Sequence, residues 1–382
     1  MNNLIICSIM SIKLKDIIYA KRGSTITSNE FKINPGSYPL ISASAQNNGV
    51  FGYINYYMYE GGHITISMNG NAGCVFYQKD KFSANSDVLV LSNIDNKISN
   101  NKFIFYWLKK HENTKIKSLC KGTTRLRLSN DDVLNLEINL PPIEEQNAII
   151  SIIEPIERII KNLKTIKYKL ETIMNNFFVV FYLFNNEENS NKYKLRNIGK
   201  FKGGISTLDK NNYDSGINFI NYMDIYKNFV INDDIKLRLY NASEKDIKSY
   251  IVSYGDLLLT ASSEIKEEIA FSSVYLSNKQ AIFNGFSKIY KYDQNILLPI
   301  YAAFYFRSEF FRKEVIKLAT GYTRFNLSIK DAKNIEISIN NFEFQKKFSK
   351  IVEPLLNLST KANKIEKILN DSLLKITKKL IV

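Results

Sequence analysis

The sequence predicts an α+β protein in which two β-rich globular units are joined by a pair of long antiparallel coiled-coil helices and related by an internal pseudo-twofold repeat. Two observations carry this prediction. A segment in the middle of the chain, from Gly122 to Pro155, recurs without a gap from Gly321 to Pro354, at a constant offset of 199 residues. Each copy also leads into a long stretch whose apolar residues step by three and four, as in a coiled coil. A period of about 200 residues indicates duplicated domains.

A second pair of matching segments heads the two units. The stretch from Lys13 to Ile17 (KLKDI) matches the stretch from Lys194 to Ile198 (KLRNI), here at an offset of 181 residues. Because the offset grows from 181 to 199 within the unit, the second copy carries 18 extra residues, in a region where the copies share almost no identity. A constant frame therefore surrounds a variable insert.

Composition and charge limit the classes of protein to which this chain can belong. The chain has 382 residues, 45% of them hydrophobic and 23% charged, which is ordinary for a globular protein with two cores. Its net charge of +15 favours a polyanionic partner, and nucleic acid is the first candidate. Three scattered cysteines and two histidines form neither a disulfide framework nor a metal-ligand spacing.

Targeting and membrane segments are not expected. The apolar run from Leu4 to Ile12 is short and has no basic flank before it, which is unlike a signal peptide. The run from Phe177 to Phe184 is too short to cross a bilayer. We therefore expect a cytoplasmic protein with no membrane partner.

The globular part of each unit reads as a series of short strands followed by a helix. In the first unit, β-branched and aromatic segments are separated by Gly and Asn, and residues 69–73 (NGNAG) have the composition of a hairpin turn. The predicted strands are 38–42, 50–57, 63–67, 74–77 and 88–91, before a helix over 101–110. In the second unit they are 217–220, 251–252, 256–260, 270–275 and 281–290, before a helix over 298–317.

A long helix closes each unit. Pro141 and Pro142 precede the first one, and Glu144 and Glu145 fall in its first turn, where the helix dipole favours carboxylates. A heptad seam of this length must be covered, and packing of the two helices on each other is the simplest solution. Pro155 and Pro354 lie at matched positions inside them and predict a kink. The first seam contains Ile149, Ile152, Ile156, Ile159, Leu163, Ile166, Leu170, Ile173, Phe177 and Val180. The second contains Phe348, Ile351, Leu355, Leu358, Ala362, Ile365, Leu369, Leu373, Ile376 and Leu380.

The predicted domains follow from these elements. They are a first globular domain (1–142), a first long helix (143–184), a polar linker (185–192), a second globular domain (193–341) and a second long helix (342–382).

Several short motifs together resemble the DNA specificity subunit of type I restriction-modification systems. They are residues 140–146 (LPPIEEQ), preceded by 122–125 (GTTR) and 128–129 (LS), with 39–42 (PLIS), 47–53 (NNGVFGY) and 255–259 (GDLLL). The second helix start, 340–345 (NNFEFQ), departs from the pattern because it lacks both prolines.

The resemblance implies two target recognition domains, each reading one half of a split double-stranded DNA sequence. It implies that the spacer helices dock two adenine methyltransferase subunits and that translocating restriction subunits can join. Residues Glu145, Gln146 and Gln345 of the helix starts are the candidate docking residues. The chain itself would carry no cofactor, with S-adenosylmethionine, ATP and Mg²⁺ expected only on the partner subunits.

Candidate DNA-contacting residues lie in the matched Gly-x-Thr-Arg loops and in polar runs between strands. Arginine can fork onto phosphate or guanine, and asparagine can pair with adenine. Two other interpretations stay open: an Arg that pairs with a carboxylate inside the fold, and an Asn that only marks a turn. In the first unit the candidates are Lys21, Arg22, Ser44, Gln46, Asn47, Asn48, Asn69, Asn71, Lys121, Thr123, Thr124, Arg125 and Arg127. In the second they are Lys202, Asn221, Tyr222, Ser262, Ser263, Lys266, Tyr322, Thr323, Arg324 and Asn326.

Motifs of catalysis are missing from the sequence. It contains no Asn-Pro-Pro-aromatic tetrad of adenine methylation, no Gly-x-Ser-x-Gly elbow and no phosphate-binding loop ending in Gly-Lys-Ser/Thr. We therefore expect a recognition subunit that is not itself an enzyme. Two alternatives remain: a specificity subunit of a methylation-only or type IIB-like assembly, and a structural coiled-coil adaptor that does not bind DNA.

Overall fold

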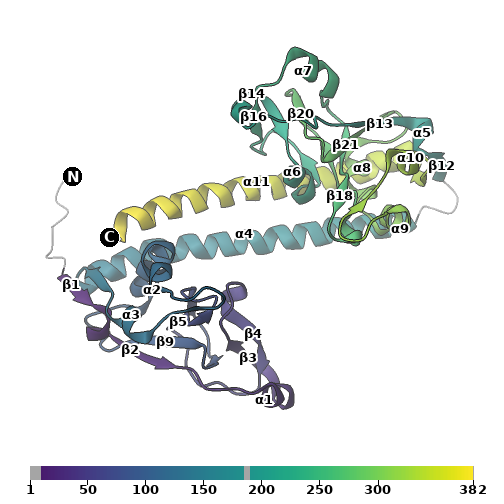
Figure 1. Cartoon of the computed structure of the whole chain (residues 1–382). Helices are drawn as coiled ribbons and strands as arrows, with labels where there is room; N and C mark the ends of the chain where they lie inside the picture. Colours follow the sequence, from purple (N-terminus) through teal and green to yellow (C-terminus); the bar gives the residue numbers. More distant parts are fainter. Residues whose placement is uncertain (1–9, 185–189, 382) are drawn as a thin grey trace. The chain divides into compact units, whose positions relative to one another are not determined.

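The computed structural model describes residues 10–184 and 190–381, so most of the predicted linker over 185–192 lies outside the described residues. The chain divides into two compact units, Met1–Lys161 with Ile368–Val382, and Asn162–Lys367. Two long helices, α4 (Ile143–Leu183) and α11 (Phe342–Leu380), each contribute to both units (Figure 1). The spacer helices are thus shared between the units.

The first unit is built on two sheets. A four-stranded antiparallel sheet has the order β2 (Ile18–Arg22), β9 (Val88–Asn93), β5 (His63–Ser67), β7 (Val75–Gln78). A three-stranded sheet has the order β4 (Val50–Ile54), β3 (Pro35–Ile41), β8 (Ser83–Ala84), with β3 and β8 parallel. Two short pairs complete it, β1 (Met10–Lys13) with β11 (Glu137–Leu140) and β6 (Asn69–Gly70) with β10 (Leu126–Arg127). Its short α-helices are α1 (Ser28–Ile33), α2 (Asn101–Lys110) and α3 (Asn130–Leu134).

The second unit repeats this topology. Its larger sheet has the order β13 (Gly199–Gly203), β21 (Ser287–Tyr292), β17 (Leu257–Thr260), β19 (Ser272–Tyr275), β15 (Val230–Ile231). Its smaller sheet has the order β16 (Arg238–Tyr240), β14 (Tyr213–Ile220), β20 (Ala281–Phe283), again with the last pair parallel. The short pairs are β12 (Ser190–Lys194) with β23 (Glu336–Asn340) and β18 (Ser262–Ser263) with β22 (Phe325–Asn326). The shorter α-helices are α5 (Leu195–Ile198), α6 (Tyr222–Lys227), α7 (Glu244–Tyr250), α8 (Pro299–Tyr305), α9 (Glu309–Leu318) and α10 (Ile329–Ala332).

The two units confirm the predicted duplication strand by strand. The insert of the second unit contains α6, β15 and α7, which have no counterpart among the elements described for the first unit. The α+β class and the two-domain repeat predicted from the sequence are confirmed.

Three predicted elements differ from the structure. The segment 281–290 is two strands because the chain leaves the smaller sheet after Phe283 and joins the larger one at Ser287. The segment 298–317 is two helices, since the chain turns between α8 and α9 and Arg307 points inward to bond four carbonyls. The predicted strand 251–252 is reduced to one bridge, between Val252 and Ala281.

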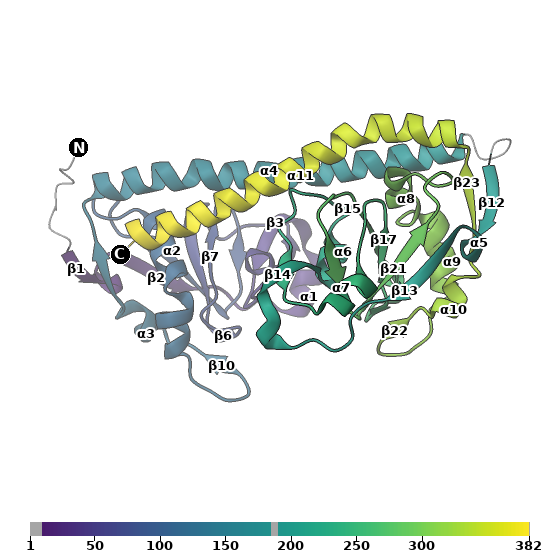
Figure 2. The ribbon, with the colours of Figure 1, turned by 90° about the horizontal axis from the view of Figure 1, so that it is seen from above.

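Within each unit the long helices pack against each other and against the globular core. In the second unit Phe177 stacks on Phe348 and Phe181 lies against Phe344, so the two helices run antiparallel there (Figure 2). In the first unit Ile149, Ile150 and Ile153 share a core with Leu373, Ile376 and Leu380. Both helices remain helical through their internal prolines, and the kink itself stays a prediction.

The predicted seam is only half correct. On α4, Ile149, Ile156, Leu163, Leu170 and Phe177 are buried or half-buried, whereas the alternate seam positions are exposed. The packed face is rotated toward Ile153, Ile160 and Met174 because each helix covers a globular core as well as its partner helix.

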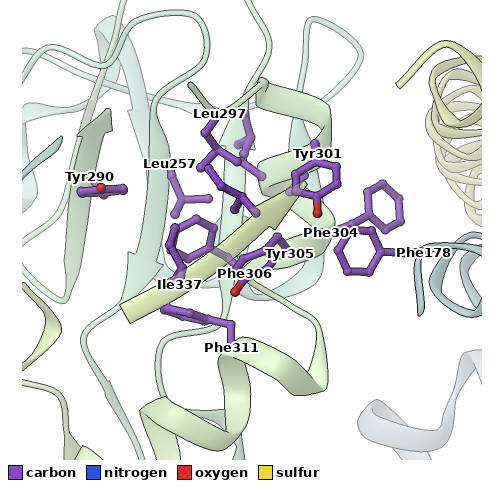
Figure 3. Close-up of a cluster of buried hydrophobic side chains, with 14 of the residues drawn as sticks. Phe178, Leu257, Tyr290, Leu297, Tyr301, Phe304, Tyr305, Phe306, Phe311 and Ile337 are labelled. Carbon is purple, nitrogen blue, oxygen red and sulfur yellow. The ribbon is translucent and has the colours of Figure 1, made fainter. Parts of the chain in front are cut away.

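The core of the second unit is rich in aromatic residues. Phe178 of α4 packs among Tyr301, Phe304 and Tyr305 of α8 (Figure 3). Such edge-to-face and offset contacts fix the side chains more strongly than area burial alone. Helix α4 is therefore held to the globular core by its own side chains.

Candidate nucleic-acid interface

A tight loop with the same backbone structure occurs in both units, at the Gly-x-Thr-Arg motifs. In the first, the N–H of Lys121 donates to the carbonyl of Arg127 at 2.8 Å, and the reverse bond is also 2.8 Å. In the second, Thr320 and Asn326 exchange the same two bonds at 3.1 and 2.8 Å. Each loop begins with a glycine at positive φ, Gly122 (116°) or Gly321 (130°). A Cβ there would lie 2.6 or 2.1 Å from a carbonyl oxygen within the loop, so the turn requires glycine.

Each loop is held to the strand pair beside it by equivalent bonds. In the first unit Leu128 donates to the carbonyl of Met68 (2.8 Å), and Met68 donates to the carbonyl of Asp87 (2.8 Å). In the second unit Leu327 donates to Ala261 (3.4 Å), which donates to Phe286 (3.0 Å). We call this loop, its strand pair and the residue at 87 or 286 the recognition platform of each unit.

The platform of the first unit carries a polar cluster around Asp87. The carboxylate of Asp87 accepts from Arg125 Nη2 at 3.2 Å and from Asn69 Nδ2 at 2.5 Å. Asn71 Nδ2 donates to the carbonyl of Ala43 at 3.2 Å. The structure therefore brings together the predicted residues Asn69 and Arg125, while Asn71 contacts Ala43. It also shows that Arg125 pairs with a carboxylate within the fold while its side chain stays 58% exposed.

The rest of the loop is exposed to solvent. Thr123, Thr124 and Arg127 lie at the surface, and Lys121 is 3.8 Å from the carboxylate of Asp132. The hydroxyl groups of Thr123 and Thr124 and the guanidinium of Arg127 are thus accessible to a polyanion.

Other first-unit candidates lie in structured turns. Arg22 donates to Asn130 Oδ1 at 3.1 Å and to the carbonyl of Ser86 at 3.3 Å, and Lys21 is exposed beside it on β2. Ser44 Oγ accepts from the N–H of Gln46 at 3.1 Å.

Asn47 and Asn48 both adopt positive φ, as expected of residues that form a turn. They line a hollow of about 790 Å³ with Tyr53, Gln78 and Lys161, and Gln78 donates to the carbonyl of Asn48. None of the residues lining that hollow belongs to the Asp87 cluster.

The platform of the second unit borders an open pocket of about 470 Å³. Four predicted residues line it, namely Tyr222, Ser262, Ser263 and Arg324. Glu264, which the sequence places in the same polar run as Ser262 and Ser263, lines it too. The remaining lining residues, which sequence reasoning missed, are Met223, Tyr226, Ile265, Glu268 and Phe286. Three of the missed residues are large, apolar and exposed: Met223 (45%), Ile265 (51%) and Phe286 (61%). Phe286 could have been identified from the repeat, because the offset of 199 residues aligns it with Asp87 of the first unit.

Two second-unit candidates have local structural roles. The side chain of Asn221 caps α6, in a capping box with Asp224. Lys202 donates to the carbonyl of Ser249, with its ammonium 5.2 Å from the ring of Tyr250. Neither residue lines the pocket. Lys266 belongs to the loop that forms one wall of the pocket. Tyr322, next to Thr323 in the Gly-x-Thr-Arg loop, is 99% exposed. Asn326 pairs with Ser262 across the β18–β22 strands.

Two arginines fix the pocket walls, the half-buried Arg307 and the buried Arg312. Arg307 Nη2 donates to the carbonyls of Ile225, Tyr226 and Asn228 at 2.7 to 3.0 Å, which holds the end of α6. Arg312 donates to the carbonyls of Glu267 and Ile269, which holds the opposite loop. Burial lowers the pKa of both guanidinium groups to about 10, so both stay charged at neutral pH. No sequence motif marks this role, because the hydrogen-bond acceptors of both arginines are backbone carbonyls.

The electrostatics of the pocket favour a base edge over a phosphate. Arg324 is 4.0 Å from Glu264, and the hydroxyl of Tyr226 donates to Glu268 at 2.8 Å, which raises the pKa of that tyrosine. Two carboxylates repel a phosphate, while carboxylate oxygens can accept from the amino group of a base. Among residues 10–184 and 190–381, no group of three or more His, Cys, Asp or Glu side chains could hold a metal ion.

The two predicted docking glutamines lie in the interior. Gln146 Oε1 accepts from the N–H of Asn100 at 2.8 Å, and its amide donates to the carbonyls of Ile98 and Pro141. Gln345 makes the equivalent bonds, to Leu298, Ile296 and Asn340. Their exposed fractions are 0% and 1%, so in this structure both side chains secure the helix start instead of facing a partner. Glu145 remains exposed.

Replacing Gln146 with leucine should therefore destabilise the first unit by about 3 kcal/mol, because a buried N–H and two carbonyls lose their partner. Urea unfolding followed by the fluorescence of Trp107 checks this, since Trp107 is the single tryptophan and lies in the core of that unit. Glu145→Gln, one residue earlier and exposed, is the control and should stay within about 0.5 kcal/mol. A cost below about 1 kcal/mol for the leucine variant would contradict the structural role.

An exposed apolar stripe runs along each long helix at seven-residue spacing. On α4 its members are Ile152, Ile159, Ile166, Ile173 and Val180; on α11 they are Ile351, Leu358 and Ile365. Each is between 46% and 56% exposed. Three of them match across the repeat at the offset of 199, and the second stripe ends where Ser372 stands opposite Ile173. Regular exposed apolar rows of this kind mark protein contact surfaces.

Among the described parts of the chain, no helix is both long enough and apolar enough to cross a membrane.

Comparison with known proteins identifies the first unit. Residues 8–172 match the type I restriction modification DNA specificity domain. A candidate type I specificity subunit from Mycoplasma pneumoniae is 33% identical over 196 residues, which cover 50% of this chain and 52% of the relative. The specificity subunit of the type I restriction enzyme MpnII from the same organism is 34% identical over 153 residues, covering 40% of this chain and 45% of that protein. The match thus spans about half the length of these relatives.

A solved structure extends the likeness to the whole chain. The crystal structure of the S subunit of a type I restriction-modification system from M. genitalium aligns with 100% of this chain and 98% of its own, with a TM-score of 0.74 and 16% identity. At that identity the likeness concerns the fold. The resemblance seen in the sequence is therefore confirmed: residues 8–172 match the type I restriction modification DNA specificity domain, and the chain has the fold of a type I specificity subunit.

Proposed function

We propose that this chain is the DNA specificity subunit of a type I restriction-modification complex, and that it reads a bipartite double-stranded sequence with one half-site per unit. The observation that carries the proposal is the pair of recognition platforms, which share a backbone framework and differ in their side chains. Direct readout needs this combination. Contacts with the DNA phosphates position a protein on the duplex, whereas side chains that reach the base edges specify the sequence. The net charge of +15 supports attraction to DNA.

The candidates whose side chains are exposed or half-buried at the two platforms are the proposed contact residues. In the first unit they are Asn69 and Arg125 around Asp87, with Asn71 beside Ala43 and with Thr123 and Thr124 in the loop. In the second they surround the pocket and include Tyr222, Ser262 and Arg324, with Tyr322 at the loop tip. The target recognition domains would span 1–142 and 193–341.

The long helices are the proposed docking sites for two adenine methyltransferase subunits. Each helix carries one apolar stripe, and three positions match between the stripes, which suits two copies of one partner. Restriction subunits would join through the methyltransferases. The chain would be non-catalytic, and S-adenosylmethionine, ATP and Mg²⁺ would bind the partners.

Methylation mapping tests this function. Cells that express the chain with its neighbouring methyltransferase should show a split motif with methyladenine in both halves, and cells with the methyltransferase alone should not. Exchanging residues 1–120 with those of a relative should change one half only. A stable complex without new methylation would favour the coiled-coil adaptor. Methylation without cleavage of unmodified DNA, in the presence of every neighbouring subunit, would favour the methylation-only assembly.

A further inference from the structure

Asp87 and Phe286 occupy the same backbone position in the two recognition platforms. Each lies two residues after an asparagine, Asn85 or Asn284. The carbonyl of that asparagine accepts from the N–H of the next residue after Asp87 or Phe286, which is Val88 or Ser287. Each also accepts, through its own carbonyl, the bond from Met68 or Ala261 that ties the platform together. The repeat therefore places a carboxylate and a phenyl ring at one equivalent point.

We propose that this position determines the base chemistry that each unit recognises. Asp87 positions a polar fork made of Arg125 and Asn69 for hydrogen bonding to a purine edge. Phe286 instead forms an apolar wall that receives the C5-methyl group of a thymine in the second half-site. This inference rests on the proposed function and deepens it.

In the first unit the argument is geometric. One carboxylate binds both Arg125 Nη2 (3.2 Å) and Asn69 Nδ2 (2.5 Å), so both side chains are oriented together. An oriented guanidinium can donate two parallel bonds to O6 and N7 of guanine. Asp87 is half-buried and acts through Arg125, which makes it a positioning residue.

In the second unit no carboxylate stands at this position, and the pocket has a different chemistry. Phe286, Met223 and Ile265 are exposed apolar side chains around the same pocket, while Arg324 lies at its edge beside Glu264. Thymine is the one base with a methyl group in the major groove, and contact with apolar side chains is how proteins read it. The carboxylates of Glu264 and Glu268 disfavour a phosphate in the pocket. A base edge with a methyl group is therefore the occupant that fits.

Base analogues test the two contacts separately. The full chain is used to select its preferred sequence from random duplex DNA. The selection is repeated with Arg125→Ala and with Arg324→Ala, and the half-site whose preference each variant loses is assigned to the unit that carries the substitution. We expect a thymine in the second half-site whose replacement by deoxyuridine, which lacks only the methyl group, weakens binding about 10-fold. We expect a guanine in the first half-site whose replacement by 7-deazaguanine weakens binding by a similar factor.

Variants connect these effects to the two residues. Phe286→Ala should abolish the preference for thymine over uracil and leave the 7-deazaguanine effect unchanged, whereas Phe286→Leu should retain much of the preference. Asp87→Asn should reduce the 7-deazaguanine effect and leave the thymine preference unchanged. The controls are Phe51→Ala, an exposed aromatic residue of the first unit, and Asp95→Asn, an exposed carboxylate of that unit.

The outcomes separate this inference from the function beneath it. If the chain selects a sequence but the variants leave both analogue effects unchanged, or no thymine of the second half-site shows the deoxyuridine effect, the inference is wrong and the proposed function stands. If the chain selects no sequence, the proposed function fails and the inference fails with it.

Discussion

Replacing Phe178 with alanine is expected to destabilise the second unit by about 4 kcal/mol, the typical cost of truncating a fully buried phenylalanine. Phe178 is 2% exposed, and its ring lies 5.3 to 5.4 Å from the rings of Phe348 and Tyr301. It therefore joins α4, α8 and α11 at one point. The cavity left by alanine cannot close easily because the surrounding side chains are aromatic rings fixed by one another.

Hydrogen exchange measures this effect locally. Peptides from α8 and from residues 342–367 of α11 should lose protection in Phe178→Ala, because they line the new cavity. Peptides from β9 in the first unit serve as an internal reference. Tyr168→Ala is the matched control, since it removes an aromatic ring from the same helix that is 72% exposed. Equal losses in the two variants would show that the aromatic cluster does not hold this helix.

Replacing Ile166 and Ile173 together with glutamate is expected to weaken methyltransferase binding at least 100-fold, about 3 kcal/mol. Both residues are about half exposed, so the free chain should tolerate the change. An apolar partner surface, however, would have to cover two carboxylates without compensating cations, which is costly. The size of this effect depends on the stripe being a docking surface, so it tests that part of the proposed function directly.

Co-purification of the full chain with the methyltransferase subunit gives the measurement. The matched control is Tyr168→Glu with Asn175→Glu, which has the same spacing and lies about 200° around the helix. Circular dichroism of each variant confirms that the helix persists. If the control pair and the stripe pair weakened binding equally, charge and not the stripe would be responsible.

The sequence determined the repeated architecture because duplication leaves a constant offset that needs no tertiary information. The match between Gly122 and Gly321 also located the two recognition loops, since only glycine fits a tight turn at positive φ. The helix starts were predicted well: α4 begins at Ile143, and its first-turn carboxylates are those expected of a helix start. Periodicity and motif thus predicted the order of these elements.

Other features were decided by tertiary packing. The heptad rule predicted one seam, but each helix also covers a globular core, so five of the ten seam positions on α4 and three of the ten on α11 form an exposed stripe. Gln146 and Gln345 belong to the helix-start motif and were predicted to dock a partner. The fold buries both, because their amide oxygens accept from the backbone N–H groups of Asn100, before α2, and Leu298, before α8. Asn221 likewise serves its own helix cap.

The recognition pocket could not be read from the sequence either. Met223, Ile265 and Phe286 lie on segments far apart in the chain, and no local pattern marks them as neighbours. The duplicated frame, the loops and the long helices could be predicted along the chain, because they depend on local backbone preference and periodicity. Which side chains meet on each platform depends on contacts between residues far apart in the sequence, so the folded structure was needed to find them.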